Sequence, residues 1–240
     1  MYNFTFHRPT TVRQAAGLLA RNPDGKLLAG GHSLLPVMKQ RLAQPSALVD
    51  LSLVEGMTGV ELKGRSVVIG AMTRHADVAN SQVLKDAMPG LAAVPGSIGD
   101  PQVRNRGTIG GSIANNDPNA DYPAACLGLG ATIITKISFP IAKKCAYEKF
   151  KHPASGFALV GVFVSKRGPD IRVAVTGAGS NGVFRVKSFE EALKKRFAAK
   201  SLEGMSIPAT GMNSDIHASP EYRAHLVGVL ARRALAKANA

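Results

Sequence analysis

The pattern of apolar and polar positions in the first 54 residues predicts a small α/β lobe. Residues 2–6 alternate as in a short strand, and apolar side chains recur at helical spacing from Val12 to Leu19. This helix is expected to end near residue 21, with Thr10 or Thr11 as its N-cap. The remaining elements are expected to be a strand over residues 26–29, a helix over 34–42 and a strand over 47–51.

The next part of the chain is expected to form a second lobe that begins with a β-hairpin. Residues 59–62 and 66–69 flank a Lys-Gly-Arg turn, and Thr73 is the expected cap of a short helix that runs to residue 79. The pattern then predicts helices over residues 81–94 and 122–129, followed by a strand over 131–139.

The C-terminal part combines strands and helices, so the fold class is α+β. Antiparallel strands are expected over residues 157–165 and 171–176, and helices over 188–197 and 220–237. Ser188 is followed three residues later by Glu191, the spacing of a capping box.

The composition favours a cytoplasmic globular protein. Of the 240 residues, 45% are hydrophobic, and no apolar run reaches the length of about 18 residues that a membrane span needs. The N-terminus lacks the charged and then apolar order of a secretory signal. Two cysteines are too few for a disulfide framework or for a cluster held by four thiolates.

The net charge of +14 raises the question of an anionic partner. The basic residues are scattered, with only small clusters at residues 143–144, 194–196 and 232–233, and no nucleic-acid-binding motif accompanies them. We therefore expect no nucleic-acid binding. The charge is interpreted as a solvated basic face, or as a surface that faces an acidic partner subunit.

Two glycine-rich turns, far apart in the chain, are the strongest chemical signal. The first is Ala29-Gly30-Gly31-His32-Ser33 and the second is Thr108-Ile109-Gly110-Gly111-Ser112. Glycine lets the backbone take positive φ and removes the Cβ atoms that would block a phosphate. Successive N–H groups then form a concave anion site, so the two turns together suit the pyrophosphate of a dinucleotide.

A third glycine-rich stretch, residues 177–182, satisfies GxGxxG but is interpreted as a connecting turn. A nucleotide-binding fingerprint needs a helix that opens at the loop, and residues 183–186 are β-like. The chain also has no metal-ligand cluster, no nucleophile elbow and no paired catalytic carboxylates. We therefore predict no catalytic residue and no metal site on this chain.

The stretches around the two turns, residues 29–52 and 98–125, resemble the FAD-binding medium subunits of molybdenum hydroxylases. This family includes aerobic carbon monoxide dehydrogenase and xanthine dehydrogenase-like enzymes. The resemblance continues through residues 69–81, 147–162 and 175–193, and so covers nearly the whole chain.

The resemblance implies a two-lobed FAD-binding domain of the PCMH/vanillyl-alcohol-oxidase type over residues 1–136, with lobes of about 1–54 and 55–136. A smaller α+β domain of the carbon monoxide dehydrogenase flavoprotein type, with an antiparallel sheet, is implied over 137–240. The sequence departs from the family after Thr132, where residues 130–132 run directly into the strand at 134–140. The family usually has a longer loop and helix there, which help to cover the flavin.

The resemblance also implies the residues that contact FAD. Main-chain amides of the first turn would face the phosphates, and Ser33 suits a helix N-cap equally well. The second turn would bind the pyrophosphate, Asn115 would donate to phosphate or flavin oxygens, and Asp121 would accept from the ribose hydroxyls. Lys149 and Phe157 would lie near the isoalloxazine ring. The expected contacts are Ala29, Gly30, Gly31, His32, Ser33, Leu34, Thr108, Gly110, Gly111, Ser112, Asn115, Asp121, Lys149 and Phe157.

Two functions from different classes follow. The resemblance implies an electron-transfer subunit that passes electrons from [2Fe-2S] clusters on a small partner subunit, through FAD, to an external acceptor. A large partner subunit would hold the molybdenum–pterin cofactor. The shortened segment after Thr132 and the positive charge leave open an FAD-free interaction or scaffold protein with the same fold.

Overall fold

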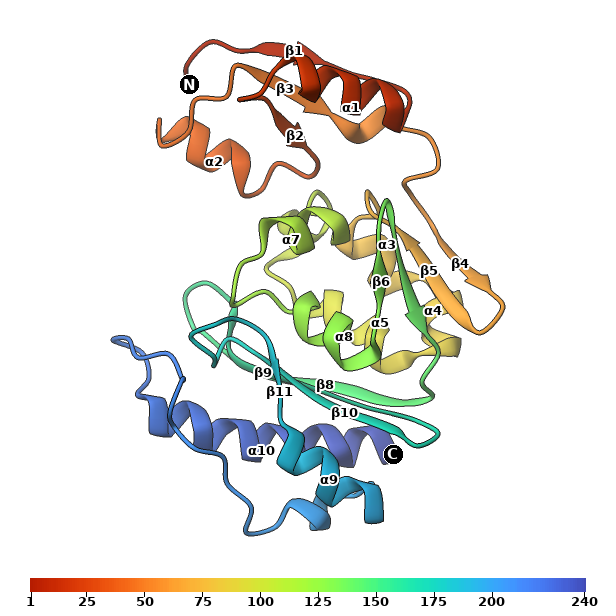
Figure 1. Cartoon of the computed structure of the whole chain (residues 1–240), viewed down its shortest axis with the longest axis vertical. Coiled ribbons are helices and arrows are strands. Elements are labelled where there is room, and N and C mark those ends of the chain that lie inside the picture. The colour runs from red at the N-terminus through yellow and green to blue at the C-terminus, as the bar shows by residue number, and fades with distance from the viewer.

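The computed structural model describes all 240 residues, which form three successive tiers along the long axis of the molecule in Figure 1. The elements of the first tier are β1 (Thr5–His7), α1 (Val12–Arg21), β2 (Lys26–Leu28), α2 (Leu34–Lys39), β3 (Ala47–Asp50) and the 3-10 turn η1 (Leu51–Leu53). The strands form a parallel sheet in the order β1-β3-β2. Thr11 and Gln14 form a capping box at the start of α1, which confirms one of the two predicted caps.

Two elements of this lobe begin or end three residues away from their predicted bounds. β1 starts at Thr5 rather than at residue 2, because its pairing with β3 begins with Thr5 opposite Ala47. α2 ends at Lys39 rather than at residue 42. Arg41 has a φ of 61°, a left-handed conformation that does not continue a helix.

The middle tier contains four antiparallel strands and six helices. Its elements are β4 (Val60–Lys63), β5 (Ser66–Gly70), α3 (His75–Asn80), α4 (Gln82–Ala87), α5 (Pro89–Gly96), α6 (Pro101–Arg104), α7 (Ile109–Asn115), α8 (Tyr122–Leu129), β6 (Thr132–Ile133) and β7 (Lys136–Pro140). The strand order is β4-β5-β7-β6.

Three features of the helices in this tier differ from the prediction. Thr73 does not cap α3, because its hydroxyl hydrogen-bonds to both the N–H and the C=O of Gly59. The helix expected over residues 81–94 is divided into α4 and α5 at Pro89, which has no N–H to continue the ladder. The second glycine turn was expected to be a loop, but it is the first turn of α7, capped by the Thr108 hydroxyl.

The strand expected over residues 131–139 is a tight hairpin. β6 pairs with β7, with Ile133 opposite Ile137, and only Ile134 and Thr135 lie between the two strands. The chain is therefore directly connected at the point where the sequence departs from the family.

The last tier is a four-stranded antiparallel sheet with helices on one face. Its elements are β8 (Lys144–Lys151), β9 (Ala158–Arg167), β10 (Asp170–Thr176), β11 (Phe184–Arg185), α9 (Lys187–Lys195), the 3-10 turn η2 (Ala199–Leu202) and α10 (Pro220–Asn239). The strand order is β11-β10-β9-β8, and β8 was not predicted. The GxGxxG stretch connects β10 to β11 with no helix at the loop, which confirms its interpretation as a connecting turn.

The capping box predicted at Ser188 is wrong. α9 begins at Lys187 after Val186, and no side chain caps it. Glu190 rather than Glu191 makes the contact that fixes the helix: its carboxylate accepts from the Val173 N–H on β10 and from Arg185. Ser188 thus lies inside the first turn.

The last sheet is covered on both faces and joins the middle tier to the C-terminal helices (Figure 1). One face packs on α9 and α10, through residues such as Val173 and Leu230. The other packs on α5 and α8, where Tyr147 and Phe163 share a core with Leu91. The division expected at residues 136/137 falls at the start of β7, which stays in the sheet of the middle tier. None of the helices combines the length and apolar character needed to cross a membrane.

Candidate functional site

The two glycine turns touch each other where the first tier meets the middle tier. A Cβ atom at Gly30 would collide with the carbonyl oxygen of Arg106 and lie 2.7 Å from the Cα of Gly107, immediately before the second turn. A Cβ atom at Gly111 would lie 3.4 Å from the Cβ of Ala29. Only glycine permits this approach of the two main chains, so the structure brings together the turns that the sequence predicted to share a ligand.

The first turn presents a row of unused main-chain donors. None of the N–H groups from Gly30 to Leu34 donates to a protein acceptor. Gly31 has a φ of 75°, and His32 and Ser33 are exposed. Ser33 occupies the N-cap position of α2 without a capping bond. Because α2 has only six residues, the open amides, rather than a long helix dipole, suit this turn to an anion.

The second turn has no such row, which corrects the expectation that its amides face a ligand. Four of its five main-chain N–H groups are already used within the protein: Ile109 donates to the Thr73 carbonyl (3.0 Å), Gly110 to the Ala71 carbonyl (2.8 Å), Gly111 to the Thr108 hydroxyl (3.1 Å) and Ser112 to the Thr108 carbonyl (3.0 Å). These bonds fix α7 on the segment that precedes α3. The side chains of Ser112 and Asn115 make no hydrogen bond within the protein, so they remain the polar groups this turn can offer.

Asp121 is held by the protein and is not open to a ribose. Its carboxylate accepts from the Tyr147 hydroxyl at 2.5 Å and from Lys149 Nζ at 2.9 Å. The side chains of Asp121 and Lys149 are 2% and 3% exposed. Burial raises the pKa of Asp121 and lowers the pKa of Lys149, while their mutual attraction opposes both shifts. The expected contact of Asp121 with ribose hydroxyls has no free carboxylate oxygen to support it.

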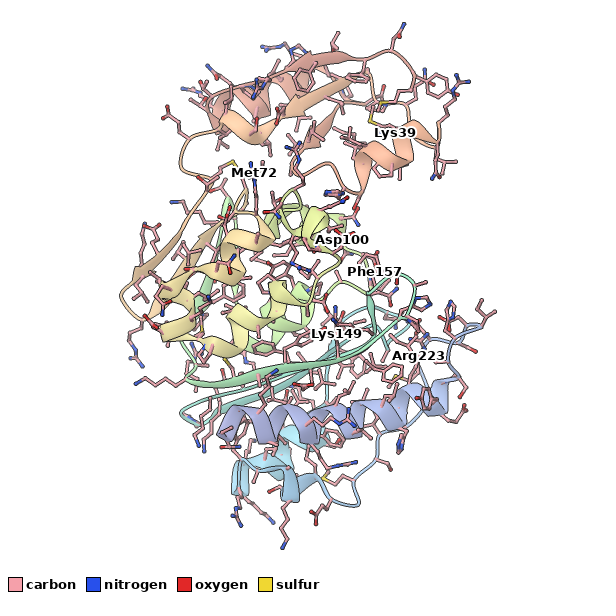
Figure 2. All side chains as sticks on the ribbon, turned by 180° about the vertical axis from the view of Figure 1, so that it is seen from behind. Lys39, Met72, Asp100, Lys149, Phe157 and Arg223 are labelled. Carbon is pink, nitrogen blue, oxygen red and sulfur yellow. The ribbon has the colours of Figure 1, made fainter.

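Lys149 also fixes the turn that presents Phe157. Its Nζ donates to the Gly156 carbonyl at 3.0 Å, and His152 Nδ1 accepts from two main-chain N–H groups of the same turn. Phe157 is 44% exposed, and Figure 2 shows it at the edge of the molecule, with Lys149 farther inside and Asp100 above it. Phe157 is therefore available for contact with a planar ligand, whereas Lys149 acts through the turn.

His75 is a residue of the site that the sequence did not single out. Its side chain is on α3, 4% exposed, and its main-chain N–H donates to the Gly107 carbonyl at 2.9 Å. Its Nδ1 lies 3.3 Å from the Tyr122 hydroxyl. Burial lowers the pKa of His75 to about 4, and the nearby His32 contributes in the same direction. The only feature of the sequence that could have pointed to His75 is its position within residues 69–81, one of the stretches that resemble the family.

Breaking the buried ion pair should destabilise the protein. Lys149→Met leaves the Asp121 carboxylate buried without its cation, so the free energy of unfolding should fall by about 3 kcal/mol. Lys151→Met is the matched control, because Lys151 is exposed and forms no ion pair; it should change stability by less than about 0.5 kcal/mol. Urea unfolding followed by circular dichroism measures both. Equal stability of Lys149→Met and wild type would contradict the structural role.

Stability should also depend on the protonation of His75. The folded state keeps the imidazole neutral to about pH 4, while the unfolded chain binds a proton near its ordinary pKa of 6.5. The stability that comes from keeping His75 neutral is therefore fully present above pH 6.5. As the pH falls toward 4, the free energy of unfolding loses up to about 3 kcal/mol from this source. His75→Gln should flatten that part of the pH profile of unfolding. If the free energy of unfolding of the two proteins falls in parallel between pH 6.5 and 4, His75 does not cause the pH dependence.

Comparison with known proteins agrees with this geometry. Residues 2–152 match the family described as FAD binding domain in molybdopterin dehydrogenase. The carbon monoxide dehydrogenase medium chain of Hydrogenophaga pseudoflava is 32% identical over 274 residues, and the alignment covers 97% of this chain and 96% of that protein. The nicotine 6-hydroxylase medium subunit of Paenarthrobacter nicotinovorans is 34% identical, with the same coverage.

A solved structure shows the same similarity in three dimensions. Carbon monoxide dehydrogenase from Hydrogenophaga pseudoflava aligns with a TM-score of 0.83 at 33% identity, over 99% of this chain and 97% of that one. The alignment with the Hydrogenophaga medium chain spans 274 positions against a chain of 240 residues, so at least 34 of its positions have no counterpart in this chain. The family match, the full-length relatives and the shared fold confirm the resemblance seen in the sequence: the chain belongs to the FAD-binding domain family of the molybdopterin dehydrogenases.

Proposed function

We propose that this chain is the FAD-binding electron-transfer subunit of a molybdenum hydroxylase. The observation that carries the proposal is the row of open amides from Gly30 to Leu34, placed where the two glycine turns touch. A diphosphate provides acceptor oxygens for several adjacent N–H donors. These N–H groups have no acceptor within the protein. The family to which the chain belongs supports FAD as the dinucleotide.

The residues of the chain would then divide into two groups around the cofactor. Residues 29–34 would hold the diphosphate, with the Ser112 hydroxyl and the Asn115 amide as further polar contacts. Phe157 would pack on the flavin, because it offers an exposed aromatic face. Lys149 would keep the turn of Phe157 in place through Gly156 and Asp121. When bound, FAD supplies the redox chemistry, since a flavin accepts electrons singly and releases two.

The names of the relatives support a role in an assembly. They include a medium chain and a medium subunit, and another relative from Paenarthrobacter nicotinovorans is a subunit of the 6-hydroxypseudooxynicotine dehydrogenase complex. We propose that an iron–sulfur small subunit delivers electrons from [2Fe-2S] clusters and that a molybdopterin large subunit oxidises the substrate. FAD on this chain would pass the electrons to an external acceptor. The cytoplasmic location expected from the sequence stays a prediction.

The short β6–β7 hairpin favours one alternative, an FAD-free scaffold with the same fold. The Thr135 carbonyl accepts from the Ala71 N–H, and the Ala71 carbonyl accepts from Gly110, so the hairpin turn is linked to the second glycine turn by two hydrogen bonds. Ile134, in this turn, is 82% exposed. If the family segment that normally covers the flavin is absent here, the cofactor would have less protection on this side.

FAD binding discriminates between the two functions. The purified chain should quench FAD fluorescence on titration, and Gly30→Ala should weaken FAD by about tenfold or more, the cost of losing one hydrogen bond to a charged acceptor. The added methyl group would push away the Arg106 carbonyl and separate the turns. Gly17→Ala is the matched control, because position 17 has no neighbouring atom within 4 Å.

Two results would argue against the proposal. Unchanged FAD affinity in Gly30→Ala would show that the contact between the turns does not shape the site. Absence of FAD both from the chain and from the complex purified with its natural partners would favour the scaffold.

A further inference from the structure

His75 has one ring nitrogen whose purpose the fold does not explain. Nδ1 is paired with the Tyr122 hydroxyl, and the ring packs against Tyr122 with the centroids 5.4 Å apart. Nε2 has no hydrogen-bond partner in the protein. Unlike Arg223 Nε, which is fully enclosed and also lacks a partner, Nε2 is not completely buried. Nε2 therefore retains access to whatever occupies the space beside it.

The hydrogen bond with Tyr122 determines which ring nitrogen of His75 carries the proton. Tyr122 is completely buried, burial raises its pKa well above 10, and its hydroxyl has no partner other than His75. The phenol is satisfied as a donor only if Nδ1 accepts from it. The neutral imidazole then carries its proton on Nε2 and is a donor there.

The position of Nε2 places this donor beside the contact between the two glycine turns. A Cβ atom at Gly107 would lie 2.7 Å from Nε2, and the Cα of the same glycine is one of the atoms that Gly30 approaches. His75 Nε2 and the first turn therefore both lie next to Gly107. Since the amides of Ile109 to Ser112 are used internally, the middle-tier side of the site offers fewer main-chain donors than the first turn.

We infer that His75 is a further cofactor-binding residue, whose Nε2–H donates to a diphosphate oxygen of the ligand held by the first turn. This inference rests on the proposed function, because it needs a ligand with a diphosphate between the turns. His75 adds a donor from the middle tier, opposite the open amides of the first turn. Tyr122 acts as a positioning residue, because it holds the ring in the tautomer that donates.

Two substitutions separate this role from a purely structural one. The amide nitrogen of glutamine reaches the position of Nε2, whereas the amide group of asparagine reaches only the position of Nδ1. If Nε2 binds the ligand, His75→Asn should weaken FAD by about tenfold, and His75→Gln should stay within about threefold of wild type. If His75 only anchors Tyr122, the order should be reversed.

The measurement is FAD fluorescence quenching, with ADP titrated by calorimetry as a second probe that has the diphosphate but no flavin. Both probes should show the same order of variants, because the contact is to the diphosphate. Circular dichroism of each variant checks folding. Tyr122→Phe keeps the imidazole and frees its tautomer; it should weaken both ligands by about two- to fivefold, and it provides a test even if His75→Asn does not fold.

The outcomes distinguish this inference from the proposed function. Two outcomes overturn the inference alone, provided that the wild-type protein binds FAD. In one, both His75 variants bind FAD as tightly as wild type; in the other, His75→Gln binds FAD more weakly than His75→Asn. A loss that appears with FAD but not with ADP also overturns it, because the contact would then be to the flavin half. Wild-type protein and complex that bind neither ligand overturn the proposed function, and the inference with it.

Discussion

The close approach of two main chains, at Gly30 and at Arg106–Gly107, is the constraint on which the site depends. The first tier has a small sheet of three short strands and few buried residues, so its position relative to the middle tier relies on contacts such as this one. A side chain larger than glycine at position 30 has no room. The contact leaves five successive N–H groups of the first turn without acceptors, beside a second turn in which the N–H groups of Ile109 to Ser112 are bonded within the protein. The first turn thus provides most of the open main-chain donors, an asymmetry suited to an anion bound mainly from one side.

The N-terminal end of α8 connects the second turn to the rest of the site. Tyr122 bonds to His75, which packs on Gly107 and so supports the second turn. The preceding residue, Asp121, pairs with Lys149, which holds the turn of Phe157. Neighbouring residues on one helix therefore position both the diphosphate side and the proposed flavin side of the site. Because Asp121 and Tyr122 are both buried, movement of α8 would disturb the two sides together.

Features set by neighbouring residues could be predicted from the sequence, while features set by distant residues could not. The cap at Thr10 or Thr11 and the absence of a helix after the GxGxxG stretch depend on a few adjacent positions, and the structure agrees with both predictions, with Thr11 as the cap. The use of the amides at residues 109–112 depends on the carbonyls of Ala71 and Thr73, which no local pattern reveals. The resemblance implied a ribose contact for Asp121, and its real partners, Tyr147 and Lys149, were not foreseen because they lie on β8, a strand whose mixed charged and apolar residues show no clear period.

Amide hydrogen exchange, followed residue by residue with and without FAD, tests the central claim most directly. In the FAD-free protein, the N–H groups of Gly30 to Leu34 should exchange rapidly, while those of Ile109 to Ser112 should already be protected by their bonds within the protein. Saturation with FAD should slow exchange in the first turn and change the second turn little. Protection of the second turn alone, or a first turn that exchanges equally fast in saturating FAD, would contradict the account.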